Sequence, residues 1–327
     1  MIVRRKMLAS LTALAIAAVT AGLTALVASA ETGRPAECSS PVKDINYDMG
    51  DKTPIIMVHG LNGDAKTWRY TTLWDLIEKS PRLYVAANFE FRAKYLTVYP
   101  NLRKLRDGYN SLYDSADRLA RTINCVSAVS KQNGGTGKVI VAGYSLGGLL
   151  THLALKPSEV PYSGDMPDVT KKVGLVITVA DAWRSYPFVK APEFDKSIPV
   201  LAMAGNVIRQ RNTTKGLVYN DTQSDDWVKL SHATTQGNTI GPIGGVYVRH
   251  CKRDMKWWPF GLDTARLCSH ENLLENPNIM QHMFMIMGVA DRKFREDSQV
   301  AVNPTPTIGP TGGWTGTYAP TPPTSVG

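Results

Sequence analysis

The sequence predicts an α/β protein in which a mostly parallel β-sheet carries helices on both faces. Short apolar runs alternate along the chain with longer stretches of helical periodicity, as they do in repeated strand–helix–strand units. The chain has 327 residues, of which 43% are hydrophobic and 20% charged, and this suits one large domain with a buried core. We expect that domain to span residues 31–300.

The expected strands are short apolar runs bounded by turn-forming residues. Most of them are apolar at every position, as in strands that are covered on both faces of a parallel sheet. Their ranges are Pro54–Val58, Leu83–Phe91, Val139–Ala142, Val173–Val179, Ile198–Met203 and Val246–Val248.

The expected helices lie between these strands. Ser115–Lys131 repeats apolar residues at steps of three and four, as an amphipathic helix does, and the glycines at 134, 135 and 137 end it. The other expected helices are Trp68–Lys79, Leu146–Leu155 and the Met-rich Ile279–Ala290.

The N-terminus has the pattern of an export signal. Basic residues at positions 4–6 precede an almost entirely apolar run over Met7–Val27, and Ala28-Ser29-Ala30 offers a small-x-small cleavage site. We therefore expect a signal peptide over 1–30 and a secreted protein. The alternative is a membrane-anchored protein, because the uncleaved run is long enough to span a bilayer.

The distribution of charge along the chain limits the kinds of partner that it can bind. The formal charge is +9, but three of these charges lie in the first six residues and the others are scattered. This argues against a nucleic-acid partner and leaves contact with a membrane or lipid surface open.

From Asn303 the chain is dominated by Pro, Thr and Gly, so we expect a disordered tail over 301–327.

Four cysteines follow the expected signal peptide, and an even number in an exported chain predicts two disulfides. Of the three pairings we favour Cys251–Cys268, which closes a short loop, together with Cys38–Cys125, which ties the N-terminal arm to an expected helix. Four free thiols are the alternative. We expect no metal site, since no CxxC or clustered Cys/His spacing occurs.

The strongest local motif is Gly143-Tyr144-Ser145-Leu146-Gly147, a G-x-S-x-G sequence between an expected strand and an expected helix. A serine at such a sharp turn is lifted above the sheet edge, where a histidine can reach its hydroxyl. Side chains at Gly143 and Gly147 would collide with the turn. Ser145 is therefore the candidate nucleophile.

A second glycine-containing loop, His59-Gly60-Leu61-Asn62-Gly63, follows the first expected strand. Acyl transfer needs two N–H donors where the carbonyl oxygen becomes negative, and losing one typically costs about 2.7–4 kcal/mol of transition-state stabilisation. The candidate donors are the backbone N–H groups of Leu61 and Leu146.

A serine nucleophile needs a base, and the base needs an acid that orients it. His270 is the candidate base, because it lies on the loop between the last expected strand and the last expected helix. The alternatives are His232 and His250, whereas His59, His152 and His282 are expected to be structural.

The candidate acid follows the strand Ile198–Met203, where Asp225 and Asp226 are adjacent. Only one of them can face the imidazole, and we favour Asp225, with Asp226 as its alternative. Asp181, at the end of the preceding strand, is a weaker candidate.

Two stretches that are rich in aromatic residues, Arg92–Tyr113 and Trp183–Phe194, are expected either to line a pocket for an acyl chain or to cover the core. Their aromatic members are Tyr95, Tyr99, Tyr109, Tyr113, Trp183, Tyr186 and Phe188.

The segments IIMVHGLNG, VIVAGYSLGG, SDDWV and SHENLLENP together resemble the α/β-hydrolase superfamily, and within it the secreted bacterial lipases and esterases. The resemblance covers roughly residues 50 to 295 and implies the α/β-hydrolase fold with a serine acyl-transfer mechanism. It supports Asp225, because the family's acid often stands three residues before a Val, here Val228. About 17 residues, Ala182–Ile198, separate two expected strands where larger relatives carry a cap domain, so no large cap is expected.

The resemblance implies a secreted serine esterase or lipase that cleaves a small ester or lipid substrate through an acyl-enzyme on Ser145, without a cofactor. One fold hosts many chemistries. An amidase, a peptidase or an acyltransferase with the same three residues is therefore an alternative. A non-catalytic, cell-wall-associated protein attached by its Pro/Thr-rich tail is another.

Overall fold

The computed structural model describes residues 34–38, 45–91, 102–156, 158, 165–185, 189, 191–213, 216–252 and 264–302. The expected signal peptide lies outside these residues, as does the expected tail from residue 303 on.

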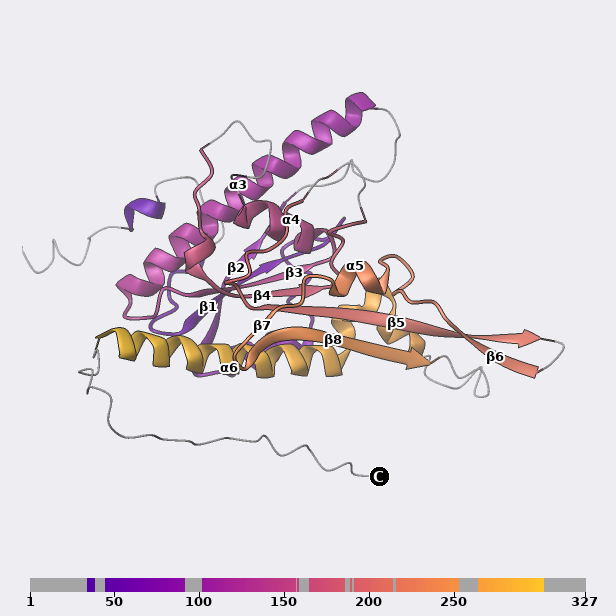
Figure 1. Cartoon of the computed structure of the whole chain (residues 1–327). Coiled ribbons are helices and arrows are strands. Elements are labelled where there is room, and N and C mark those ends of the chain that lie inside the picture. The colour runs from indigo at the N-terminus through magenta and orange to yellow at the C-terminus, as the bar shows by residue number, and fades with distance from the viewer. Residues whose placement is uncertain are drawn as a thin grey trace, which may run out of the picture.

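A mostly parallel sheet with helices on both faces confirms the expected fold class (Figure 1). In the described part of the chain the sheet has eight strands in the order β2-β1-β3-β4-β5-β8-β7, and β6 pairs with β5. The β5–β6 and β7–β8 pairs are antiparallel and the others are parallel. The strands are β1 Thr53–Val58, β2 Leu83–Phe89, β3 Val139–Tyr144, β4 Val173–Val179, β5 Val200–Thr213, β6 Gly216–Asp221, β7 Thr239–Ile240 and β8 Ile243–Lys252.

Helices α3 and α4 pack on one face of the sheet and α6 on the other (Figure 1). Helix α2 lies beside α6 on that second face. Their bounds are α2 Thr72–Glu78, α3 Leu102–Gln132, α4 Leu146–Leu155 and α6 Pro277–Val302, and a short α5 spans Leu230–Thr234. Single 3-10 turns lie at Ala36–Cys38, Thr170–Lys172, Thr264–Cys268 and His270–Glu275.

Strand β1, which lies between β2 and β3, is buried on both faces because successive side chains of a strand point to opposite sides. Ile56 and Val58 pack in the core beneath α3 and α4, whereas Ile55 and Met57 pack in the core above α6. All four are fully buried. This is why the strand is apolar at every position.

Several elements differ in length from those expected. Helix α2 begins at Thr72 instead of Trp68, because Thr71 has extended backbone and its hydroxyl caps the helix by accepting from the Trp74 N–H. Strand β5 runs on to Thr213 as one arm of a hairpin with β6, which extends beyond the rest of the sheet (Figure 1). Helix α6 continues through a charged segment to Val302, so residues 301–302 of the expected tail are helical.

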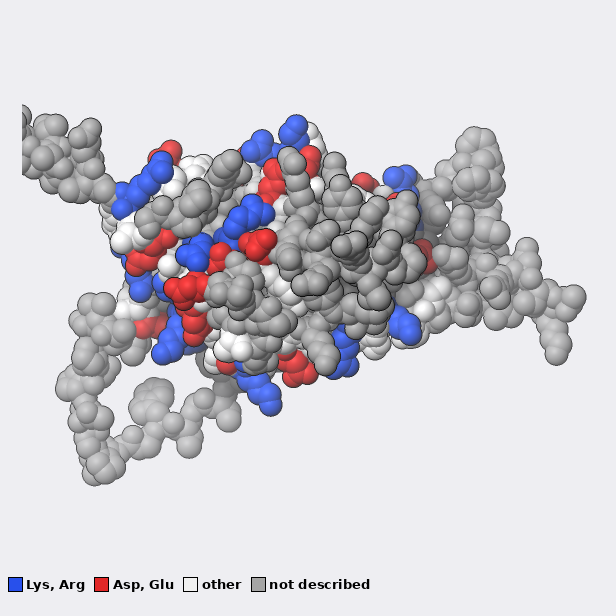
Figure 2. Space-filling model, turned by 90° about the horizontal axis from the view of Figure 1, so that it is seen from above, with Lys and Arg blue, Asp and Glu red and all other residues white. Residues whose placement is uncertain are grey.

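The segment between β4 and β5 contains no helix or strand among its described residues, in line with the expectation of no large cap. None of the helices in the described ranges combines the length and the apolar character that a bilayer-spanning helix requires. On the face seen in Figure 2, the described Lys and Arg side chains lie interspersed with Asp and Glu.

Candidate active site

Ser145 lies in the one-residue turn between β3 and α4, with φ 53° and ψ −118°. A side chain is disfavoured in this conformation, and such strain is held in place only by the surrounding structure. The Ser145 N–H donates to Val179 O at 2.8 Å, and its carbonyl accepts from the Gly148 N–H at 3.0 Å. The turn therefore fixes the hydroxyl relative to the ends of two strands.

The two glycines of the motif allow the close approaches that this turn requires. A Cβ atom at Gly143 would lie 2.8 Å from the carbonyl carbon of Gly147, and one at Gly147 would lie 2.5 Å from the carbonyl oxygen of His59. Both contacts are with backbone, which cannot move aside cheaply. Gly147 thus lets the start of α4 pack directly against the loop that follows β1.

The structure brings Ser145, His270 and Asp225 together although they are distant in the sequence. His270 Nε2 lies 2.7 Å from Ser145 Oγ, and His270 Nδ1 lies 2.8 Å from Asp225 Oδ2. An ionised carboxylate can only accept, so Nδ1 carries the proton and Nε2 accepts from the serine hydroxyl. All three residues are buried. The arrangement can withdraw a proton from the serine.

The local backbone separates the two adjacent aspartates. Asp225 Oδ1 accepts from the N–H groups of Trp227 at 3.0 Å and Val228 at 2.7 Å, which leaves Oδ2 for His270. Asp226 is exposed, with φ 79°. The Val228 found three residues after Asp225 is thus itself a donor to the carboxylate.

Other parts of the chain hold His270 in place. The His270 N–H donates to Asp225 O at 2.8 Å, and the Tyr144 hydroxyl donates to His270 O. Burial raises the pKa of Tyr144, and so do the nearby carboxylates of Asp225 and Glu271, so this hydroxyl stays a donor. The ring of Tyr144 also stacks against the imidazole, at 5.3 Å between centroids.

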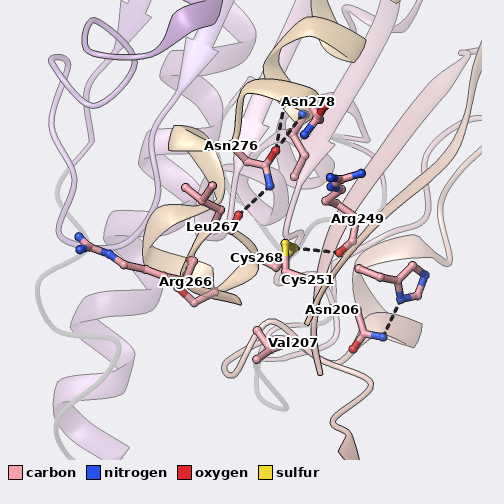
Figure 3. The surroundings of a disulfide bond; sticks show 12 residues. Asn206, Val207, Arg249, Cys251, Arg266, Leu267, Cys268, Asn276 and Asn278 are labelled. Carbon is pink, nitrogen blue, oxygen red and sulfur yellow. Dashed lines mark hydrogen bonds between the residues drawn. A yellow bond between two sulfur atoms is a disulfide. The ribbon is translucent and has the colours of Figure 1, made fainter. Parts of the chain in front are cut away.

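A disulfide between Cys251 and Cys268 joins the end of β8 to the turn before His270 (Figure 3). Asn276, just before α6, donates from Nδ2 to Leu267 O at 3.0 Å. The second disulfide joins Cys38 to Cys125 on α3. The cysteines therefore pair as favoured from the sequence, and none of those in the described residues is free.

His59 braces the loop after β1. Its Nε2 accepts from the Phe91 N–H at 3.2 Å, so Nδ1 carries the proton and donates to Gly60 O at 2.7 Å. Burial lowers the pKa of His59, which keeps the ring neutral. This loop carries Leu61, whereas Leu146 is the first residue of α4, where a helix leaves its N–H groups without an internal acceptor.

The remaining candidate residues lie elsewhere. Asp181 faces His152, with 2.9 Å between Oδ2 and Nε2, so it is engaged away from His270. His250 contacts Asn206, His282 stacks on Tyr247, and His232 lies on α5. In the described chain, no group of three or more His, Cys, Asp or Glu side chains could hold a metal ion.

A cleft of about 320 Å³ opens at Ser145. Leu61, Asn62 and Gly63 from the loop after β1 line it, together with Tyr144 at the end of β3 and Ser145 in the turn. Trp227, next to the acid segment, and His270 and Glu271, in the 3-10 turn that carries the base, complete the lining. Sequence reasoning did not single out Tyr144, Trp227 or Glu271 for this site. The available signal was their position next to Ser145, Asp226 and His270.

Of the aromatic residues expected to line a pocket, the structure describes the side chains of Tyr113 and Trp183, and neither of them lines this cleft. Tyr113 and Trp183 are buried in the core and do not line it, because helix packing covers the first and the His152 ring stacks on the second. Tyr109 lies on α3, and Tyr95, Tyr99, Tyr186 and Phe188 lie outside the described residues.

Backbone with positive φ gathers around this site. The non-glycine residues with positive φ include Asn62 at 57° in the loop after β1, Ala180 at 52° after β4, and Gln223 at 50° before the acid. Ser145 and Asp226 share this property. Each of these residues lies beyond the carboxyl end of a strand.

No protein-family model matches the chain, and no curated protein matches it in sequence. Similar solved structures include the product of gene lin2722 from Listeria innocua, with 14% identity over 72% of this chain and 94% of that one and a TM-score of 0.40. Esterase B from Lactobacillus rhamnosis is 14% identical over 88% of this chain and 99% of that one, with a TM-score of 0.40. Aspergillus fumigatus lipase B is 24% identical over 42% of this chain and 26% of that one, with a TM-score of 0.27. At these identities and TM-scores, none of these likenesses assigns a family or an activity to this chain.

Proposed function

We propose that this protein is a serine hydrolase that cleaves carboxylic esters of the lipid type through an acyl-enzyme on Ser145. The observation that carries the proposal is the chain of two contacts, 2.7 Å from Ser145 Oγ to His270 Nε2 and 2.8 Å from His270 Nδ1 to Asp225 Oδ2. Nucleophile, base and orienting acid are thus within hydrogen-bond reach of one another.

In the first half of the reaction, His270 Nε2 takes the hydroxyl proton while Ser145 Oγ attacks the carbonyl carbon. The carbonyl oxygen becomes negative and accepts hydrogen bonds from the Leu61 and Leu146 N–H groups. The bond to the leaving oxygen then breaks, and the imidazolium gives its proton to the departing alcohol. Asp225 stays ionised and stabilises the imidazolium throughout.

In the second half, His270 takes a proton from a water molecule, and the resulting nucleophile attacks the acyl carbon. The bond to Ser145 Oγ breaks, the serine regains its proton from His270, and the carboxylic acid leaves. Because His270 Nδ1–H donates to Asp225 Oδ2, the imidazole returns to the same tautomer for the next cycle.

The walls of the cleft favour an ester over a peptide. Leu61, Tyr144 and Trp227 offer apolar surface beside the serine. A peptide bound in extended form is usually held by main-chain hydrogen bonds along an exposed strand. Small apolar esters need only the surface that is present here.

Labelling with a fluorophosphonate probe tests this function. We expect the wild type and Ser298→Ala, a control near the C-terminal end of helix α6, to be labelled, and Ser145→Ala to remain unlabelled. An unlabelled wild type would favour the non-catalytic, cell-wall-associated alternative. Faster cleavage of peptide anilides than of p-nitrophenyl esters would favour an amidase or peptidase.

We also propose that the protein is secreted after removal of residues 1–30. The basic start, the apolar run and the Ala28-Ser29-Ala30 site support this, and the two disulfides suit an oxidising compartment. Mass spectrometry of the protein from the culture medium should give a mature N-terminus near Glu31. A cell-bound chain that retains residues 1–30 would show the membrane-anchored form instead.

A further inference from the structure

Trp227 is an exposed aromatic residue beside the proposed catalytic base. The residue is 66% exposed, and it is one of four exposed large apolar residues in the described part of the chain. Exposed apolar surface at a cleft is typical of a contact site for a ligand. Of the four, Trp227 lines the cleft at Ser145.

The indole is held in a fixed relation to the reacting groups. The backbone N–H of Trp227 donates to Asp225 Oδ1 at 3.0 Å, and Asp225 Oδ2 accepts from His270. The ring stacks against His270, with 5.9 Å between centroids and 17° between planes. The acid, the base and the indole therefore form one connected unit.

The proposed chemistry decides which part of the ester meets this unit. The carbonyl oxygen must lie near the N–H groups of Leu61 and Leu146. The leaving oxygen must lie within hydrogen-bond reach of His270 Nε2, because the imidazolium protonates it. The alcohol attached to that oxygen consequently extends along the His270 side of the cleft, where the indole lies.

Charge on this side limits the alcohol further. Glu271 follows His270 directly, is exposed and lines the same cleft. The described residues that line the cleft include three ionisable side chains, which are Tyr144, His270 and Glu271. Of these, Glu271 is the one that carries a carboxyl group. Its carboxylate repels an anionic alcohol and tolerates a neutral or a cationic one.

We propose that Trp227 and Glu271 form a leaving-group subsite that accepts apolar alcohols without a negative charge. The subsite rests on the proposed esterase function and deepens it. The indole offers a flat face to the alcohol, and the carboxylate excludes acidic groups. The acyl chain lies outside this subsite.

Two series of esters test the role of Trp227. In the first series a butyryl group is joined to ethanol or to benzyl alcohol; in the second, p-nitrophenol is joined to a short or a medium acyl chain. Trp227→Ala should lower the kcat/KM ratio of benzyl to ethyl butyrate roughly five- to tenfold. It should leave the acyl-chain ratio of the second series unchanged, and Trp227→Phe should restore part of the alcohol preference.

Ratios separate this subsite from a general disturbance of His270, which lowers every kcat/KM by the same factor. Tyr70→Ala, which removes another exposed aromatic side chain away from the cleft, is the matched control. An unchanged benzyl-to-ethyl ratio in Trp227→Ala overturns the subsite. A change in the acyl-chain ratio instead assigns the indole to the acyl group and overturns it as well.

Benzyl butyrate and its para-carboxylate form test the role of Glu271. Glu271→Gln should raise the relative kcat/KM of the anionic ester roughly threefold, and Glu275→Gln, in the same 3-10 turn, should not. Equal ratios in both variants remove Glu271 from the subsite. If the wild type neither hydrolyses these esters nor reacts with the fluorophosphonate, the esterase function itself fails, whereas altered ratios alone concern the subsite.

Discussion

Adjacent carboxylates can have unrelated environments, and Asp225 and Asp226 illustrate the cause. Asp225 is 2% exposed and its two oxygens are shared among two backbone N–H groups and His270. Asp226 has positive φ, which turns the chain so that its own side chain faces solvent. The turn, and not the residue type, thus determines which aspartate meets the histidine.

This difference predicts opposite outcomes for the two amides. Asp225→Asn should lower kcat roughly 10³–10⁴-fold, because an amide in this place favours the wrong histidine tautomer. Asp226→Asn should keep kcat within about threefold of the wild type. The assay is steady-state hydrolysis of a p-nitrophenyl ester, with thermal melting as the folding control. A larger loss in Asp226→Asn would reverse the assignment.

Single residues also show how far the sequence could indicate the site. Ser145 and His270 were identifiable because each stands in a motif placed between two expected elements. Tyr144 and Trp227 were not, because an aromatic side chain gives no sign of whether it packs in a core or faces a cleft. Their roles depend on the stacking with His270, which exists only in the folded chain.

Among the elements, the strands with apolar runs were predictable, including β2 at the edge of the sheet, whereas the β5–β6 hairpin was not. Strands β1, β3 and β4 are buried throughout, so their apolar runs mark them in the sequence. The end of β5 carries the polar run Arg209 to Thr213, which has no apolar pattern, and it forms a hairpin with the short β6. Pairing between strands stabilises this hairpin, and one-dimensional patterns do not contain that information.

The anchoring of the loop after β1 to the end of β2 predicts a pH effect on stability. Burial holds the pKa of His59 below its ordinary value of 6.5, whereas the unfolded chain binds the proton near that value. At pH values between the lowered pKa and about 6.5, the unfolded state therefore binds more protons than the folded state. The free energy of unfolding consequently falls as the pH falls below about 6.5.

His59→Gln should weaken this pH dependence, because glutamine binds no proton. The urea midpoints of both proteins at about pH 7.5 and about pH 5.5 measure it. Burial also lowers the pKa of His282 and His232, so part of the dependence should remain. Identical midpoint shifts in the two proteins would show that His59 is not a source of the effect.

For the whole molecule, the two disulfides are expected to serve different purposes. Cys38 and Cys125 are separated by 87 residues and Cys251 and Cys268 by 17. Loop-closure entropy then gives about 4–5 kcal/mol for the first disulfide and about 3 kcal/mol for the second. The second, however, ends two residues before His270.

Replacing each pair of cysteines by serine should therefore impair stability more in one variant and turnover more in the other. The Cys38→Ser/Cys125→Ser variant should lose more free energy of unfolding, measured by urea denaturation. The Cys251→Ser/Cys268→Ser variant should lose more kcat, measured on the same ester. If one variant were the more impaired in both measurements, the two disulfides would not differ in purpose.

The positive-φ residues around the cleft carry a consequence for the evolution of this molecule. Asn62, Gln223 and Asp226 each hold a conformation that glycine adopts without steric cost, yet each has a side chain. Selection for heat resistance and selection for turnover would act in opposite directions at these positions, since relaxed backbone loosens the geometry that the reaction needs. Variants that gain thermal tolerance at the sheet edge should therefore be the slower ones.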